Sequence, residues 1–118
     1  DAAPICKFPM IPPRPLKPGL LVELLNAVTG WNATIDDFVT TGERIFNLAR
    51  MFNVREGLTR KDDLLPVRFE EVLEEGGSAG EAYPRGELEK LLDEYYTLRG
   101  WSHEGIPTPE TLKRLGLD

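Results

Sequence analysis

A run of apolar residues at helical spacing between Thr34 and Gly57 is the feature that most constrains the fold of this chain. Apolar side chains recur there every three or four residues, which is the period of an α-helix that buries one face. Thr34 is placed to cap the helix, because its hydroxyl can accept a hydrogen bond from a first-turn amide. We predict a central core helix, crossed by a second helix at Gly42, where a missing side chain permits close approach. The stripe consists of Ile35, Phe38, Val39, Gly42, Ile45, Phe46, Ala49 and Phe52.

Three shorter stretches show helical signals with their own start and stop residues. Leucines follow Pro18 at helical spacing up to Gly30; proline suits the first turn of a helix, and glycine suits the position after its end. Apolar residues recur in the same way over 87–99, with Gly100 as the expected stop. The stretch 108–116 begins with the capping threonine and first-turn proline of Thr-Pro-Glu. No alternation of period two, which would indicate a strand, is present in the sequence.

The remaining segments are predicted to be irregular. The first nineteen residues hold six of the ten prolines, and proline removes a backbone donor, so we expect an extended arm at 1–17. Residues 58–72 suggest an irregular strap, and the four glycines of 74–86 mark a mobile surface loop. The predicted fold is a small irregular all-α domain over 1–118, in which a body at 18–118 has about three main helices plus short ones.

Charge, length and cysteine count exclude several classes of function. The net charge is −6 and no cluster of Lys and Arg appears, which argues against binding of nucleic acid. No apolar run approaches the roughly 18 residues that span a bilayer, so we expect no membrane contact. A single cysteine excludes an internal disulfide and, with no signal-peptide pattern, predicts a cytoplasmic protein. The first residue is Asp rather than Met, which suggests a piece of a longer protein or a processed one.

Few residues are placed to carry catalysis. His103 lies in a polar SHEG turn, and a general base needs an orienting partner and a pocket, so we expect a solvated surface histidine. Asp62 and Asp63 could divide acid and base roles in a small hydrolase or isomerase, but adjacent carboxylates in loops are usually turn or capping residues. No zinc or EF-hand spacing is present. We therefore assign no catalytic residue in this chain.

Cys6 is the residue whose setting suggests a ligand. It lies in the proline-flanked arm beside Lys7, and an adjacent ammonium group favours the thiolate, which is the form that binds metal. A free cysteine is more often a small buried hydrophobic residue, and that alternative stays open. One thiolate cannot hold an iron–sulfur cluster, so such a role requires ligands from outside these residues.

Four long stretches carry a resemblance to a known family. They are ELLNAVTGW at 23–31, GERIFNLARMFNVREGLTRKDDLLP at 42–66, LLDEYYTLRGW at 91–101 and GIPTPETLKRLGL at 105–117. Their sequence and order resemble the C-terminal region of the tungsten- or molybdenum-pterin aldehyde ferredoxin oxidoreductases. The family also has an Asp-x-x-Gly-x-Cys pattern, which here corresponds to Asp1 through Cys6, with Pro4 in place of the glycine.

This resemblance implies roles for the arm and for the chain as a whole. Cys6 would be the fourth thiolate ligand of a 4Fe-4S cluster, Asp1 would contact the pterin, and Lys7 would belong to the same cofactor-binding stretch. The parent enzyme would oxidise aldehydes to carboxylates at tungsten (or molybdenum) held by a bis-pterin cofactor, and pass electrons through the cluster to ferredoxin. The present chain would be a C-terminal fragment that packs on the rest of the parent polypeptide and is inactive alone. A homodimer of the parent is compatible with this interpretation.

An autonomous helical protein-interaction module is the alternative, because three good helices could close a core without help. The two hypotheses differ in the surface that they require. A fragment would expose apolar surface near residues 1–28 that its parent normally covers, whereas an autonomous module would not.

Overall fold

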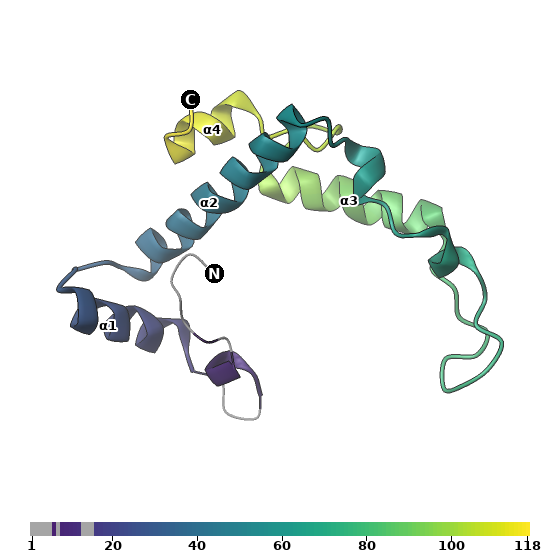
Figure 1. Ribbon diagram of the computed structural model, residues 1–118, viewed down its shortest axis with the longest axis horizontal. Helices are drawn as coiled ribbons and strands as arrows, with labels where there is room; N and C mark the ends of the chain where they lie inside the picture. Colours follow the sequence, from purple (N-terminus) through teal and green to yellow (C-terminus); the bar gives the residue numbers. More distant parts are fainter. Residues whose placement is uncertain (1–5, 7, 13–15) are drawn as a thin grey trace. The chain divides into compact units, whose positions relative to one another are not determined.

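The computed structural model describes residue 6, residues 8–12 and residues 16–118, and the described part is helical. It contains no β-strand within those residues, and one isolated bridge pairs Trp101 with Pro107. The elements are η1 (Phe8–Met10), α1 (Pro18–Thr29), α2 (Ile35–Arg55), η2 (Arg60–Asp63), η3 (Val67–Glu70), α3 (Arg85–Arg99) and α4 (Pro109–Leu115), as drawn in Figure 1. The predicted all-α class is confirmed. No helix of the described part is long and apolar enough to cross a membrane.

The chain divides into two compact units, residues 1–46 and residues 47–118. Helix α2 continues through the boundary, so its first part belongs to one unit and its last turns belong to the other. Each unit is described by itself below. The single domain predicted over 1–118, with an arm at 1–17 and a body at 18–118, stays a prediction.

In the first unit, α1 and the start of α2 are joined by a connection that Asn26 holds in place. The Asn26 side chain donates to the Ala33 carbonyl at 2.9 Å and accepts from the Ala33 amide at 3.0 Å. Its amide group thus satisfies both backbone groups of Ala33, as a neighbouring peptide group would. Gly30 ends α1 in the left-handed conformation, with φ of 73°, as predicted for that glycine. Thr34 accepts from the Asp37 amide at 3.1 Å, which confirms the predicted cap of α2.

Helix α1 is apolar on both its buried and its exposed side. Leu21 and Val22 are buried, whereas Leu20, Leu24 and Val28 are 41%, 49% and 87% exposed. The helix contains one charged residue, Glu23. A helix that is apolar around most of its circumference is typical of the interior of a larger protein.

The N-terminal arm is not extended throughout. Residues Phe8–Met10 form a single 3-10 turn, in which the Ile11 amide donates to the Phe8 carbonyl at 3.1 Å. The φ angle that proline imposes is compatible with a 3-10 turn as well as with an extended chain, so proline content alone did not decide between them. The rest of the predicted arm is described at residues 6, 11, 12, 16 and 17.

The apolar stripe of α2 is not buried by the described residues, contrary to the prediction of a central core helix. A side chain added at Gly42 would meet no atom within 4 Å, so no second helix crosses α2 closely there in the described part of the chain. Spacing shows which face of a helix is apolar, but it does not show what covers that face. The exposed members, between 43% and 56% accessible, are Ile35, Val39, Ile45, Phe46 and Phe52.

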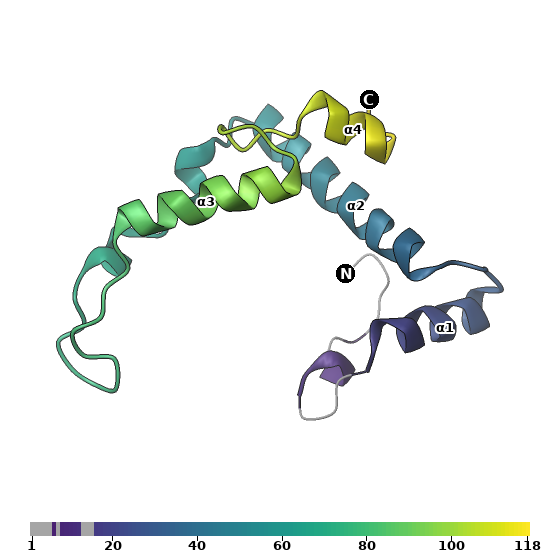
Figure 2. The same ribbon diagram turned by 180° about the vertical axis from the view of Figure 1, so that it is seen from behind.

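The second unit contains the last turns of α2, helices α3 and α4, and the connections between them (Figure 2). Gly100 and Gly116 end α3 and α4 in the left-handed conformation, and Thr108 caps α4, as predicted. Residues 58–72 form the predicted irregular strap, with two short 3-10 turns, one of which follows Pro66. The loop predicted at 74–86 is largely exposed, and its mobility stays a prediction.

Candidate functional site

The centre of the second unit is a partly buried ion pair between Arg50 of α2 and Asp63 of η2. Arg50 is 8% exposed, and its guanidinium donates to both carboxylate oxygens of Asp63, at 2.9 and 2.6 Å. The short helix η2 that carries Asp63 begins with a capping box, in which the Asp62 carboxylate accepts from the Thr59 amide at 2.7 Å. Two parallel hydrogen bonds fix the relative orientation of the two side chains as well as their separation.

Two further groups complete the arrangement around this pair. The Tyr96 hydroxyl of α3 donates to Asp63 Oδ2 at 2.5 Å, and Arg50 Nε donates to the Gly105 carbonyl at 2.8 Å. Gly105 has φ of 74°, and a β-carbon there would collide with the Arg50 guanidinium and the Tyr96 ring. Glycine is therefore required at position 105 for the backbone to lie this close.

The electrostatics of the cluster fix its protonation states at neutral pH. Burial acts to raise the pKa of Asp63, but hydrogen bonds from Arg50 and Tyr96 and the two nearby guanidinium charges outweigh it, so this pKa lies below its ordinary value. Burial, followed by the hydrogen bond to Asp63, raises the pKa of Tyr96 to about 12. Asp63 is thus ionised and Tyr96 is neutral at pH 7.

A second buried polar contact joins the same elements. The Trp101 ring nitrogen donates to Asn47 Oδ1 at 2.7 Å, and Asn47 is completely buried. The Arg50 guanidinium lies over the Trp101 ring, 5.0 Å from its centroid, which is within cation–π range. The tryptophan thus contacts two polar residues of α2, one through its ring edge and one through its face.

Arg60 closes the outer side of the cluster. It donates to the carbonyls of His103 and Glu89, at 2.9 and 3.1 Å, and pairs with Asp93 at 2.7 Å. Its guanidinium also lies 5.2 Å from the centroid of the Tyr96 ring. These contacts tie η2, α3 and the turn after α3 together.

We call the group formed by Arg50, Asp63, Tyr96 and the Gly105 carbonyl the clamp. Its geometry suits a role in holding these elements together rather than acid–base catalysis. The Asp62 carboxylate accepts from Thr59, which also lowers the pKa of Asp62, while Asp63 is occupied by Arg50 and Tyr96. General acid–base catalysis needs a group whose pKa is near the working pH and which can reach a substrate. The hydrolase hypothesis built on these two carboxylates is therefore not supported by their geometry.

The predicted cofactor residues lie in or next to the arm. Asp1 and Lys7 lie outside the described residues. Cys6 is described, exposed and not in a disulfide. Among the described residues, no group of three His, Cys, Asp or Glu side chains could hold a metal ion. His103 is 70% exposed, as expected for a solvated histidine, and lies 3.4 Å from the carboxylates of Asp93 and Glu104.

Comparison with known proteins identifies the family. The family model described as "Aldehyde ferredoxin oxidoreductase, domains 2 & 3" matches residues 1–117. This chain belongs to that family. A tungsten-containing aldehyde ferredoxin oxidoreductase of Pyrococcus horikoshii is 41% identical over 120 aligned positions, which cover 100% of this chain and 19% of that protein. The tungsten-containing aldehyde ferredoxin oxidoreductase of Pyrococcus furiosus is 43% identical over 80% of this chain and 16% of that protein.

Other proteins that this chain resembles are named for other substrates. A protein of Pyrococcus furiosus named aliphatic sulfonate oxidoreductase, WOR-like subunit, is 34% identical over 99% of this chain and 19% of its own length. Among solved structures, the active-site complex BamBC of benzoyl coenzyme A reductase, in complex with 1,5-dienoyl-CoA, matches with a TM-score of 0.70 and 31% identity, over 89% of this chain and 14% of that chain. The proteins that this chain resembles are therefore named for different substrates. The present chain spans about a fifth of the length of the curated relatives that it matches.

Sequence reasoning missed the polar centre of the second unit. Asn47 and Arg50 lie on α2 beside the apolar stripe, where polar residues usually face solvent, so periodicity gives no sign that they are buried. A signal was present in the aromatic residues, because a buried tyrosine or tryptophan needs a polar partner for its O–H or N–H group. Tyr96 and Trp101 lie near the end of α3, and their partners are Asp63 and Asn47.

Proposed function

We propose that this chain is the helical C-terminal part of a tungsten- or molybdenum-pterin aldehyde ferredoxin oxidoreductase, in which Cys6 supplies one thiolate to a 4Fe-4S cluster. The family match over residues 1–117 carries the proposal. Two relatives, 41% and 43% identical to this chain, are named tungsten-containing aldehyde ferredoxin oxidoreductases. Their names favour an aldehyde as the substrate class and ferredoxin as the electron acceptor. When bound, the metal and cluster would supply the oxidation of an aldehyde to a carboxylate, with the electrons passing to ferredoxin.

The setting of Cys6 fits the proposed ligand. Its side chain is exposed and free, so its sulfur is accessible to ligands from another part of the protein. A cluster of this kind needs four cysteine ligands, and the chain contains one cysteine, so three ligands would come from outside these residues. Asp1 and Lys7 remain proposed contacts to the cofactors, together with Cys6, in the same stretch of the arm.

The exposed side of α1 supports a role as a wall against the rest of the polypeptide. Leu20, Leu24 and Val28 form an uncharged stripe that the described residues leave accessible. Contiguous apolar patches on soluble proteins commonly mark surfaces that contact another part of the protein or a partner. This is the surface near residues 1–28 that the fragment hypothesis requires, and it makes the autonomous interaction module the less favoured alternative.

Replacement of Cys6 in the full-length enzyme tests the ligand assignment. We expect Cys6→Ser to lower the iron and acid-labile sulfide bound per chain and to remove the visible absorption of the cluster. Met10→Ala, at an exposed residue of the same arm, is the matched control and should leave iron content unchanged. Unaltered iron and sulfide in Cys6→Ser would show that this thiolate is not a ligand, whatever happens to activity.

A further inference from the structure

Helix α2 has its polar side covered by the described chain and its apolar side open. Asn47 and Arg50 are buried on the polar side, where they hydrogen-bond with Trp101 and Gly105. A helix that packs on one side only normally turns its apolar face inward. Because α2 buries polar groups on one side and presents apolar groups on another, its composition is that of a helix with packing partners on both sides. The exposed apolar members in the first unit are Ile35, Val39, Ile45 and Phe46.

The first unit buries few of its apolar side chains. Among its described residues, Leu21 and Val22 are the apolar side chains that are buried. Units well below about 70 residues have marginal cores and usually need a disulfide, a metal or association to be stable. The single cysteine of the chain excludes an internal disulfide. The core of the first unit therefore needs apolar contacts from another segment.

Gly42 lies in the middle of the open face of α2. With about 3.6 residues per turn, it projects between Val39 and Ile45 around the helix. Glycine is among the least favourable residues in a helix interior, but it lets a second backbone come close. A β-carbon at Gly42 would meet no atom of the described residues within 4 Å, so the crossing helix expected there is not supplied by them. The glycine marks the point of the open face at which another backbone can approach most closely.

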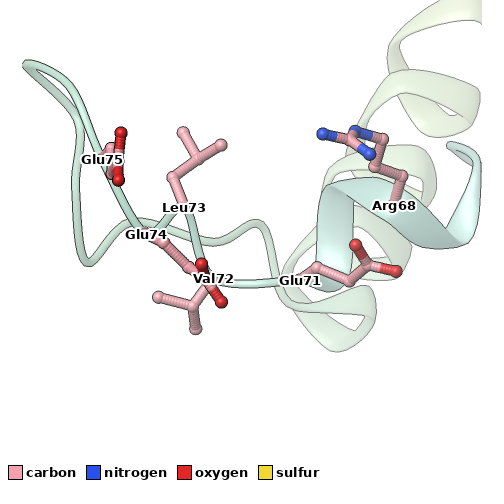
Figure 3. A pocket seen from close by; sticks show the side chains of 6 residues that line it. All are labelled: Arg68, Glu71, Val72, Leu73, Glu74 and Glu75. Carbon is pink, nitrogen blue, oxygen red and sulfur yellow. The ribbon is translucent and has the colours of Figure 1, made fainter.

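The hollow beside η3 offers no comparable apolar face. Arg68, Val72, Leu73 and three glutamates border it. Figure 3 shows Val72 and Leu73 on opposite sides of the extended segment, so their apolar groups do not form one surface. On α2, by contrast, the apolar residues share one helical face, which can pack against another helix by placing ridges of side chains into grooves.

We infer that a helix from the rest of a longer polypeptide lies across α2 at Gly42 and covers Val39, Ile45 and Phe46. The inference rests on the proposed function in one respect, which is that this chain is part of a longer enzyme. The Pyrococcus horikoshii relative supports this, because the match covers 19% of its length and about four fifths of it lies outside the match. Such a polypeptide has ample chain to provide the covering helix.

Two physical arguments favour the same polypeptide over a second copy or a separate partner. A covalently joined segment is held near α2 at a high effective concentration, so it competes well against any molecule in solution. Permanent contacts are also more apolar than contacts between proteins that separate, and the exposed members of the α2 face carry no charge. The open face of α2 has the composition of a core that has been cut in half.

Alanine at Gly42 in the full-length enzyme tests the close approach. Gly86 of α3 is the matched control, because it is also helical and exposed, and a β-carbon there would also meet no described atom within 4 Å. Alanine favours helix over glycine, so Gly86→Ala should leave Tm unchanged or raise it. Gly42→Ala should lower Tm by several degrees, and Gly42→Leu should lower it further, because each side chain displaces the crossing helix. A gain in Gly42→Ala that equals the gain in Gly86→Ala would overturn the inference.

Photo-crosslinking identifies the occupant without disturbing Gly42. Val39→benzoylphenylalanine in the full-length enzyme places a photoreactive ketone on the open face, where it inserts into C–H bonds that contact it. We expect a crosslink within one polypeptide, to a peptide outside residues 1–118. The same probe at Arg44, which is exposed on another side of α2, is the matched control and should join that peptide in at least about tenfold lower yield. Equal yields from both positions, a crosslink to a second copy or to another protein, or no crosslink would overturn the inference.

Iron content separates this inference from the cofactor assignment. Absence of the crosslink in an enzyme whose Cys6→Ser variant loses iron would overturn the helix contact alone. A crosslink in an enzyme whose Cys6→Ser variant keeps its iron would overturn the ligand assignment and leave the helix contact standing.

Discussion

Removal of one charge from the partly buried Arg50–Asp63 pair should destabilise the second unit strongly. Asp63→Asn keeps the shape of the side chain and one acceptor oxygen but leaves the Arg50 guanidinium, which is 8% exposed, without its countercharge. Removal of one partner of a buried pair costs about 3–5 kcal/mol. Because Asp63 is 24% exposed and asparagine keeps one acceptor, we expect a loss somewhat below that range, about 2–3 kcal/mol.

Fluorescence of Trp101 reports this unit directly. The chain has two tryptophans, so Trp31→Phe, at an exposed position, leaves Trp101 as the single probe. For a unit of this size, 1 kcal/mol corresponds to roughly 4–8 °C in Tm, so Asp63→Asn should lower the midpoint by about 8–24 °C. Glu94→Gln, at an exposed position of α3, is the control and should change the free energy of unfolding by less than about 0.5 kcal/mol.

A double-mutant cycle decides whether the effect comes from the ion pair itself. We expect Arg50→Met and Asp63→Asn to be coupled by at least about 1 kcal/mol, because each single change strands the other partner. Strictly additive effects would refute the clamp, as would a loss below about 1 kcal/mol in Asp63→Asn alone. Either result would mean that Arg50 and Asp63 stabilise the unit through packing and not through electrostatic coupling.

The Arg50–Asp63 pair also predicts how the free energy of unfolding changes at acidic pH. The pKa of Asp63 is lowered in the folded state, so its contribution is fully present above the ordinary aspartate pKa and is lost as pH falls through the lower folded value. Unfolding free energy should therefore fall as pH decreases below about 4. The Asp63→Asn variant should show a shallower fall, which urea titration at several pH values would measure.

Three other perturbations have defined outcomes. Gly105→Ala should destabilise the second unit by more than about 1 kcal/mol, because position 105 needs a positive φ and has no room beside Arg50; thermal unfolding would show it. Trp101→Phe removes the donor to buried Asn47 and should cost about 1–3 kcal/mol in urea unfolding, more than the same change at an exposed tryptophan. Tyr96 should ionise only near pH 12, seen as a tyrosinate absorption that Tyr96→Phe abolishes, and the stability that it contributes should be lost as pH rises from about 10 through that value.

Local signals predicted the helices well because they act over a few residues. Gly30, Gly100 and Gly116 end helices, and Thr34 and Thr108 cap them, each through contacts within one turn. Those are interactions that a short window of sequence contains. The boundaries of α1, α2 and α4 followed from them to within about two residues.

The core could not be predicted in the same way, because its contacts are long-range. The bonds from Arg50 to Gly105 and from Trp101 to Asn47 join positions 55 and 54 residues apart. Apolar periodicity instead pointed to a face of α2 that the described residues leave exposed. The family membership could be predicted because long segments of the sequence resemble the family in the same order, and the family match confirms it. The roles of Asp1, Cys6 and Lys7 depend on cofactors and on ligands from outside these residues, so they stay proposals.

The long-range closure of the clamp also sets an order for folding. Asn47 and Arg50 are synthesised more than fifty residues before Trp101 and Gly105, their partners across the core. A nascent chain that ends before Trp101 lacks the donor to Asn47 Oδ1 and the carbonyl that accepts from Arg50 Nε, so these two atoms stay hydrated until the later segment is made. Loop closure over such a distance is slow relative to helix formation. The second unit should therefore form its helices early and acquire its core last, in a single late step.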